Sequence, residues 1–209
     1  MKADLKNVKS LFCGLQGSGK TELAKVLTRD FERPAWFIVN LDDMVGMDDR
    51  ILKIIGAKTT ESLEKLIKKI KEIPKEKRPD LLVLDDAEHL IPTTRETLQK
   101  FPNLYDIFIN HRHIGTALFF LTRRPQDLNP LVVESCENQF YFALPTSDNV
   151  KRKLDAIDNR IIPLLRNCTK QNHRFVFYHV GDMPVFMDKI RIAKEKKGEK
   201  EVKENGEKE

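Results

Sequence analysis

The sequence predicts an α/β fold with a central, mainly parallel sheet flanked by helices and closed by a C-terminal β-hairpin. Short apolar runs that suit strands alternate with segments whose apolar residues recur at helical spacing. The first apolar run leads through a glycine-rich turn into a helical pattern, which is a unit typical of parallel sheets. With 209 residues, 40% of them hydrophobic, the chain can build one core, so we expect a single domain over residues 1–192.

The first elements follow directly from this pattern. A strand is predicted over Ser10–Cys13 and a helix over about Lys20–Phe31, which Pro34 ends. The buried-looking run Ala35–Leu41 predicts the second strand. The next residues are harder to interpret, and we expect a short helix through Arg50–Ile55.

The middle of the chain alternates again. Thr60 suits the N-cap of a helix whose apolar residues run from Leu63 to Ile73, with lysines on the opposite face. Leu81–Leu84 predicts the third strand. Helical segments are then expected over about Thr93–Lys100 and Leu104–His113.

The last elements close the sheet. A fourth strand is predicted over Thr116–Thr122 and a fifth over Gln139–Leu144, and the cap-plus-proline pair Asn129-Pro130 starts a short helix between them. Ser147 is expected to cap a helix with Val150, Leu154, Ile157 and Ile161 inward, and the hairpin follows over Arg174–Val180 and Val185–Ile190. Residues 193–209 are rich in Lys and Glu with almost nothing apolar, so we expect a disordered tail.

Composition excludes several protein classes. The three cysteines form no CxxC pair, which argues against a zinc site or a disulfide framework and for buried, inert thiols. The longest apolar run, near Ala117–Leu121, is too short to insert into a membrane. The net charge of +5 is compatible with a polyanionic partner, and we expect a soluble, cytoplasmic protein.

The glycine-rich turn carries a phosphate-binding motif. Gly14, Gln16, Gly17, Ser18, Gly19, Lys20 and Thr21 belong to a segment that fits GxxxxGK[ST] at every fixed position. Its glycines let backbone N–H groups turn toward one anion, and the helix N-terminus adds positive potential. Lys20 is expected to reach the β- and γ-phosphates of ATP, and the Thr21 hydroxyl to hold Mg²⁺.

Acidic residues follow the third predicted strand. Asp85 directly after Leu81–Leu84 suits a carboxylate that holds Mg²⁺ beside the phosphate loop. Asp86 is favoured as the residue that orients or deprotonates the attacking water, and Glu88 is the competitor for that role. With one predicted strand between the two motifs, the spacing suits RecA/ASCE-like P-loop NTPases, which place an extra strand there.

Three arginines near the fourth strand are candidates for neutralising charge on the γ-phosphate. Arg112 precedes the strand, and Arg123 and Arg124 follow it, where the tips of a parallel sheet line the ligand crevice. Each is also compatible with an ordinary surface cation. His111 and His113 lack a third ligand at useful spacing, so solvated or core histidines are favoured over a metal site.

In order, the phosphate loop, the segment LLVLDDAEHL and the segment from Arg112 to Leu144 resemble the HerA/FtsK superfamily of DNA-pumping ATPases. The Asp85-Asp86 pair and the short chain are similar to the branch that packages viral genomes into preformed capsids, including viruses of hot-spring archaea. Two positions depart from the cellular members: Asp86 stands where Glu is usual, and Arg123 where a polar sensor, usually Gln, is found.

The resemblance implies an ATP-driven translocase of double-stranded DNA that ignores sequence and works as a homo-oligomeric ring. Capsid or portal-vertex proteins would be partners, and the location would be the host cytoplasm or the capsid. Candidate DNA contacts are Arg50, Lys53, Arg95 and Lys100. Two alternatives stay open: a cellular HerA/FtsK-like motor for repair or segregation, and an ATP-dependent assembly switch with little turnover.

Overall fold

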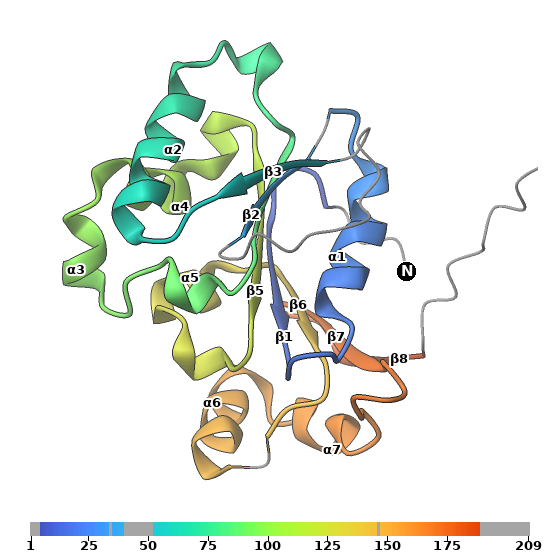
Figure 1. Ribbon diagram of the computed structural model, residues 1–209. Coiled ribbons are helices and arrows are strands. Elements are labelled where there is room, and N and C mark those ends of the chain that lie inside the picture. Colours follow the sequence, from blue (N-terminus) through green and yellow to red (C-terminus); the bar gives the residue numbers. More distant parts are fainter. Residues whose placement is uncertain (1–4, 34, 40–51, 146, 189–209) are drawn as a thin grey trace, which may run out of the picture.

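The computed structural model describes residues 5–33, 35–39, 52–145 and 147–188, and these residues build an eight-stranded sheet with helices on both faces (Figure 1). Across the sheet the strands follow the order β3-β2-β4-β5-β1-β6-β7-β8. All pairs from β3 to β6 are parallel, whereas β7 is antiparallel to both β6 and β8. The bounds are β1 Lys9–Cys13, β2 Ala35–Val39, β3 Leu52–Gly56, β4 Leu81–Leu84, β5 Ala117–Thr122, β6 Asn138–Tyr141, β7 Phe175–His179 and β8 Val185–Met187. The predicted parallel sheet and closing hairpin are therefore confirmed.

The helices divide unequally between the two faces of the sheet. Figure 1 shows α1 on one side and α2 to α5 on the other. The bounds are α1 Lys20–Leu27, α2 Thr60–Glu72, α3 Arg95–Gln99, α4 Pro102–Ile114, α5 Pro130–Ser135, α6 Asp148–Asp158 and α7 Ile161–Leu165. Short 3₁₀ turns lie at Thr28–Asp30, Lys75–Lys77, Ala87–His89 and Pro125–Asp127. The sheet thus separates two apolar cores.

The core beneath α1 is aromatic. The Phe12 ring on β1 stacks on Phe140 with 4.6 Å between the centroids and lies 5.0 Å from the ring of Phe119. Leu23 and Ala24 of α1 are buried against this layer. Each fully buried large apolar side chain contributes roughly 1.5–3 kcal/mol to folding. This packing fixes the first turn of α1 against the end of β1, where the phosphate-binding motif lies.

The opposite core receives α2, whose buried residues Leu63, Ile67 and Ile70 match the predicted apolar face. The N-cap is Thr59 rather than the predicted Thr60. Its side chain accepts a hydrogen bond from the Ser62 backbone at 3.2 Å, and the Ser62 hydroxyl accepts one from the Thr59 backbone at 3.0 Å. This reciprocal capping box satisfies two N–H groups at the helix start, which explains the one-residue shift.

The predicted helix at 50–55 is wrong where the structure describes it. Residues Leu52–Gly56 form β3, which pairs in parallel with β2. A short apolar run carries too few periods to separate a strand from a helix, and the neighbouring Ile54 and Ile55 favour extended backbone. Along the chain, two strands rather than one therefore lie between the phosphate loop and β4, the strand that the acids follow.

Smaller corrections concern element ends. The first helix ends at Leu27 and continues as a 3₁₀ turn to Asp30, and Ile161 begins α7 instead of continuing the helix that Ser147 caps. The predictions for Leu41 and for the tail at 193–209 fall outside the described residues.

Cys13, Cys136 and Cys168 are all free and buried, as predicted. In the described ranges no helix combines the length and the apolar character that crossing a bilayer requires.

Candidate functional site

The phosphate-binding motif Gly14–Thr21 forms the turn between β1 and α1. Gly17 and Gly19 adopt φ values of 76° and 102°, in the left-handed region that favours glycine. Gly19 is also the N-cap of α1, so the backbone turns there directly into the first helical N–H groups. The loop therefore presents its amides and a helix N-terminus at one place, the arrangement that suits a phosphate.

Gly14 has a different reason to be glycine. A Cβ added to it would lie 2.6 Å from Cβ of Phe142 and 2.9 Å from Oγ of Ser18. Hydrogen bonds pin the backbone on both sides: Gly14 donates to Thr122 O at 3.1 Å, and Leu15 donates to Ala143 O at 2.8 Å. The start of the loop is thus wedged between the ends of β5 and β6.

Lys20 lies folded over the same loop. Its side chain is buried, and Nζ donates to the carbonyl oxygens of Gly14 at 2.7 Å and Leu15 at 3.1 Å. Burial lowers the pKa of the Lys20 ammonium, and the nearby charges of Asp85 and Asp86 oppose that shift. The Lys20 ammonium is therefore held against the loop, close enough to the acids after β4 to feel their negative charge.

Those acids leave the sheet at the end of β4, with β5 between them and the phosphate loop. The Asp85 backbone donates to Ile38 O at 2.9 Å. Burial and then the charge of Asp86 raise the pKa of the Asp85 carboxyl. Asp86 has a φ of 46°, which is uncommon for a residue with a side chain. Two adjacent carboxylates and a cation from the loop thus share one edge of the sheet.

Glu88 and Arg123 complete this group. The Glu88 side chain is only 7% exposed, and its buried Oε2 has no hydrogen-bond partner. Its Oε1 accepts from the Arg123 backbone N–H at 3.3 Å. The Arg123 Nε lies 3.7 Å from Oδ1 of Asp86 and 3.9 Å from Oε1 of Glu88. The structure therefore brings Asp86, Glu88 and Arg123 together. The next residue, Arg124, is exposed.

Arg112 does not reach this site in its own chain. It lies near the C-terminal end of α4, before β5, and its Nη2 contacts Oε1 of Glu137 at 2.5 Å. In a parallel sheet, residues that precede a strand lie at the edge opposite to those that follow it. His111 beside it is buried, with Nε2 3.0 Å from the carbonyl oxygen of Asn7. The favoured interpretation of a core histidine holds for His111.

The fit of Mg²⁺ can be judged from the donors present. In the described ranges no group of three or more His, Cys, Asp or Glu side chains is arranged to hold a metal alone. Mg²⁺ ordinarily takes one or two protein oxygens and completes its shell with water and substrate phosphate. Thr21 on α1, together with Asp85, supplies that donor set, and the buried Ser18 Oγ without a partner lies in the same loop. The residues fit a magnesium ion carried with a triphosphate.

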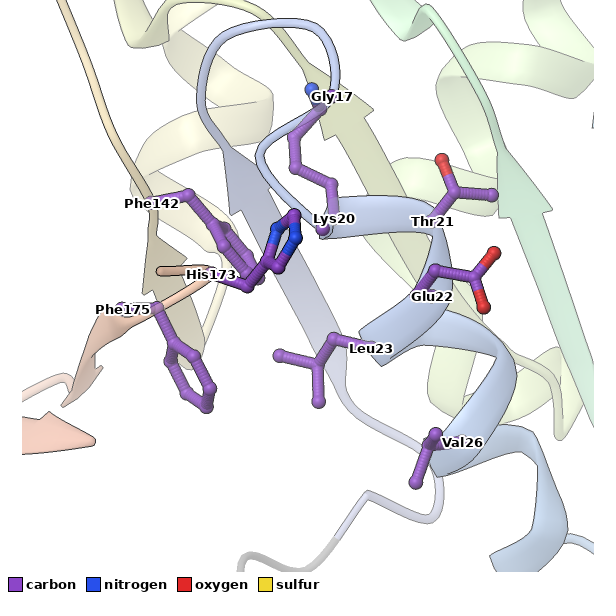
Figure 2. Close-up of a pocket in the computed structure, with 10 residues that line it drawn as sticks. Gly17, Lys20, Thr21, Glu22, Leu23, Val26, Phe142, His173 and Phe175 are labelled. Carbon is purple, nitrogen blue, oxygen red and sulfur yellow. The ribbon is translucent and has the colours of Figure 1, made fainter. Parts of the chain in front are cut away.

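Sequence reasoning missed one wall of the site. A cavity of about 490 Å³ opens beside the loop and is lined on one side by Phe142, His173 and Phe175 (Figure 2). His173 is more than 150 positions from the phosphate loop along the chain. No local motif marks these three residues, so only the pairing of β6 with β7 reveals that they meet the loop. Gln16 stays on the exposed outer turn.

Comparisons with known proteins agree with this architecture. A family model described as an AAA domain matches residues 10–128, which is more than half of the chain. No curated protein sequence matches the chain significantly.

Solved structures share the whole fold at low sequence identity. The genome packaging NTPase B204 from Sulfolobus turreted icosahedral virus 2, in complex with ATP-gammaS, has a TM-score of 0.74 at 16% identity over 88% of this chain and 98% of that one. B204 from Sulfolobus turreted icosahedral virus, described as a DNA-packaging ATPase, gives 0.75 at 16% identity, covering 90% and 100%. The conjugation coupling protein TcpA of pCW3 gives 0.61 at 14%, covering 90% and 62%.

Proposed function

Because this chain belongs to the AAA domain family of P-loop ATPases, we propose that it is an ATP-driven translocase of double-stranded DNA, and most specifically a motor that packages a viral genome into a preformed capsid. The observation that carries the proposal is the shared edge where the phosphate loop faces Asp85, Asp86, Glu88 and Arg123. The likeness in fold to a genome packaging NTPase over nearly the full length of both chains supports the DNA-moving role.

The phosphate loop binds the triphosphate. The amides of Gly14–Thr21 and the start of α1 hold the phosphates, and the Lys20 ammonium exchanges its carbonyl partners for phosphate oxygens. Thr21 and Asp85 would hold Mg²⁺, and the ion would neutralise charge on the phosphate oxygens. The buried Asp85 carboxyl, whose pKa is raised in the free protein, is well placed to receive a cation.

The two remaining acids take different roles. Asp86 orients the attacking water and accepts its proton, because its carboxylate adjoins that of Asp85 and retains solvent access, with 29% of the side chain exposed. Glu88 is almost fully buried and accepts from the Arg123 backbone, so it fixes the arginine instead of reaching the water. Arg123 then neutralises charge that develops on the γ-phosphate.

In a ring of identical chains, Arg112 acts on the nucleotide of a neighbouring chain. Arg112 lies at the far edge of its own sheet, so it can meet a γ-phosphate only in a neighbouring chain. In the same assembly, Arg95 and Lys100, exposed at α3, offer phosphate contacts to duplex DNA. Arg50 lies outside the described residues, and the Lys53 side chain is likewise not described. The capsid or portal-vertex proteins remain the proposed partners.

DNA-stimulated hydrolysis tests the proposal. Phosphate release is measured with Mg·ATP, with and without duplex DNA of unrelated sequences, between 50 and 200 mM salt. These concentrations span a range in which proteins making about 6–10 phosphate contacts lose roughly 10³–10⁵ in affinity. The translocase predicts stimulation by every duplex and a steep loss of it with salt. The Lys20→Ala variant provides the background rate. A wild-type rate indifferent to duplex DNA would refute a pump.

One observation favours a second candidate, an ATP-dependent assembly switch. Arg123 already contacts Asp86 and Glu88 in this structure and so can occupy the Asp86 carboxylate that would otherwise orient the attacking water. Replacing Arg123 with Gln separates the two functions. A motor loses turnover because charge on the γ-phosphate is no longer neutralised, whereas a switch gains turnover because Asp86 is released. If Asp86→Asn and wild type hydrolyse equally slowly, the switch is favoured again.

A further inference from the structure

The cavity beside the phosphate loop has two unlike sides. Its base is the loop itself, with Gly17, Gly19 and Lys20 among the lining residues. One part of its wall is apolar: Leu23 and Val26 project from α1, and Phe175 faces them from the start of β7 (Figure 2). A volume of about 490 Å³ lies within the usual range for small-molecule sites. The cavity therefore continues from a place suited to phosphate into one suited to an uncharged ring.

The aromatic wall is rigid. Phe175 and Phe142 are 3% and 1% exposed, and their ring centroids lie 5.2 Å apart with 32° between the planes. Both belong to the aromatic core beneath α1. Side chains locked in a core lose no further freedom when a ligand packs on the small part of them that faces the cavity.

His173 is held over the loop by a preformed turn. The Asn172 side chain accepts from the backbone N–H groups of Thr169 and Arg174, both at 3.0 Å, and donates to Asn167 O at 2.8 Å. His173 itself has a φ of 51°, a conformation that costs energy for a residue with a side chain. The turn thus maintains a strained residue at this position, which is common where a side chain contacts a ligand.

The imidazole lies against the last glycine of the loop. A Cβ built on Gly19 would be 3.4 Å from Nδ1 of His173. That Nδ1 is buried and has no hydrogen-bond partner. The imidazole therefore packs directly on the loop backbone, where the phosphate side of the cavity meets its apolar side. Figure 2 shows the imidazole between the loop and the two phenylalanines.

We propose that this cavity binds the purine base of the triphosphate, with the base packed against the imidazole of His173 and the phenyl wall, and that it discriminates purines from pyrimidines by stacking area. This inference rests on the proposed function only in placing the phosphates on the loop. Apart from the imidazole, the side chains proposed to pack on the base are hydrocarbon (Leu23, Val26, Phe142 and Phe175), and they offer no hydrogen bonds that would distinguish adenine from guanine. ATP and GTP therefore bind with similar affinity, and CTP binds more weakly.

Titration calorimetry with Mg²⁺ and four probes tests this pocket: ATP, GTP, CTP and inorganic triphosphate, which lacks base and sugar. His173→Asn keeps a residue type that tolerates a positive φ but removes the ring, and His173→Phe keeps a ring. His113→Asn changes an exposed histidine of α4 and serves as the matched control. Circular dichroism verifies that each variant is folded.

The expected result is selective. His173→Asn raises the Kd of ATP and GTP about tenfold, the size of one lost stacking contact, and leaves the Kd of inorganic triphosphate unchanged. His173→Phe and His113→Asn bind ATP like the wild type.

Two results would refute the proposal that the cavity binds the base. One is an equal weakening of ATP and inorganic triphosphate in His173→Asn, which would make His173 a support of the loop alone. The other is unchanged ATP binding in that variant. Neither result depends on DNA. A wild-type protein that shows this base selectivity but whose hydrolysis is not stimulated by DNA would refute the translocase and support base binding in the cavity.

Discussion

Replacing Gly14 with Ala tests how tightly the phosphate loop is built into the sheet. The new Cβ would lie 2.6 Å from Cβ of Phe142, whereas carbon atoms in ordinary contact are about 3.5–4.0 Å apart. One side must therefore move by about 1 Å. Phe142 is 1% exposed within the aromatic core, and its backbone donates to Cys13 O at 2.8 Å, so it cannot retreat without breaking packing.

The cost follows from this overlap. Overpacking a tight interior destabilises a protein by about 1–3 kcal/mol. For a domain of this size each kcal/mol lowers Tm by about 2–4 °C, so we expect a loss of about 2–12 °C. Thermal unfolding followed by circular dichroism measures the shift. The loop must also deform, and we expect Mg·ATP to bind more weakly in the same variant.

Gly56→Ala is the matched control. Gly56 lies at the exposed end of β3, has no atom within 4 Å of an added Cβ and does not adopt a positive φ. Its replacement should leave stability unchanged or raise it by up to about 1 kcal/mol, because alanine reduces the freedom of the unfolded chain. If Gly14→Ala were as stable as Gly56→Ala, the close approach of the loop to β6 would be refuted.

Three further predictions concern catalysis and stability. Asp86→Asn should lower kcat by about 100-fold or more, and Glu88→Gln by a smaller factor; single-turnover rates with the order reversed would exchange their roles. Lys20→Ala should abolish Mg·ATP binding and cost about 1–3 kcal/mol in urea unfolding, because it leaves two loop carbonyls without their donor; unchanged stability would contradict those bonds. Burial lowers the pKa of His111 to about 4, so the unfolded chain binds a proton first as the pH falls from 6.5, and stability falls by about 3 kcal/mol on reaching pH 4. In urea unfolding, the His111→Gln variant should not show this loss of stability between pH 6.5 and pH 4. An identical dependence of stability on pH in variant and wild type would contradict the prediction.

The sequence predicted best what is locally encoded. The first strand, its glycine-rich turn and the start of α1 follow from one continuous motif, and the strand Leu81–Leu84 with its acids follows from another. Each of these two motifs determines its own local structure, because a turn of this kind needs glycine and because a strand end in a parallel sheet faces the ligand edge. These segments appear in the structure with the predicted elements around them.

What depends on tertiary pairing was harder to predict. The strand character of Leu52–Gly56 comes from its ladder with β2, which a five-residue pattern does not encode. The meeting of His173 with Gly19 depends on β7 turning back beside β6. Arg112 belongs to the opposite edge because it precedes β5, and only the assembled sheet shows how far that places it from the loop.

Displacement of a third strand from duplex DNA tests the central claim most directly. A fluorescent oligonucleotide bound as a triplex on a linear duplex is released when a motor runs through it. We expect release by the wild-type protein with Mg·ATP, independent of the flanking sequence, and none with Lys20→Ala or with a non-hydrolysable analogue. Hydrolysis of ATP stimulated by the duplex, with the third strand left in place, would contradict translocation.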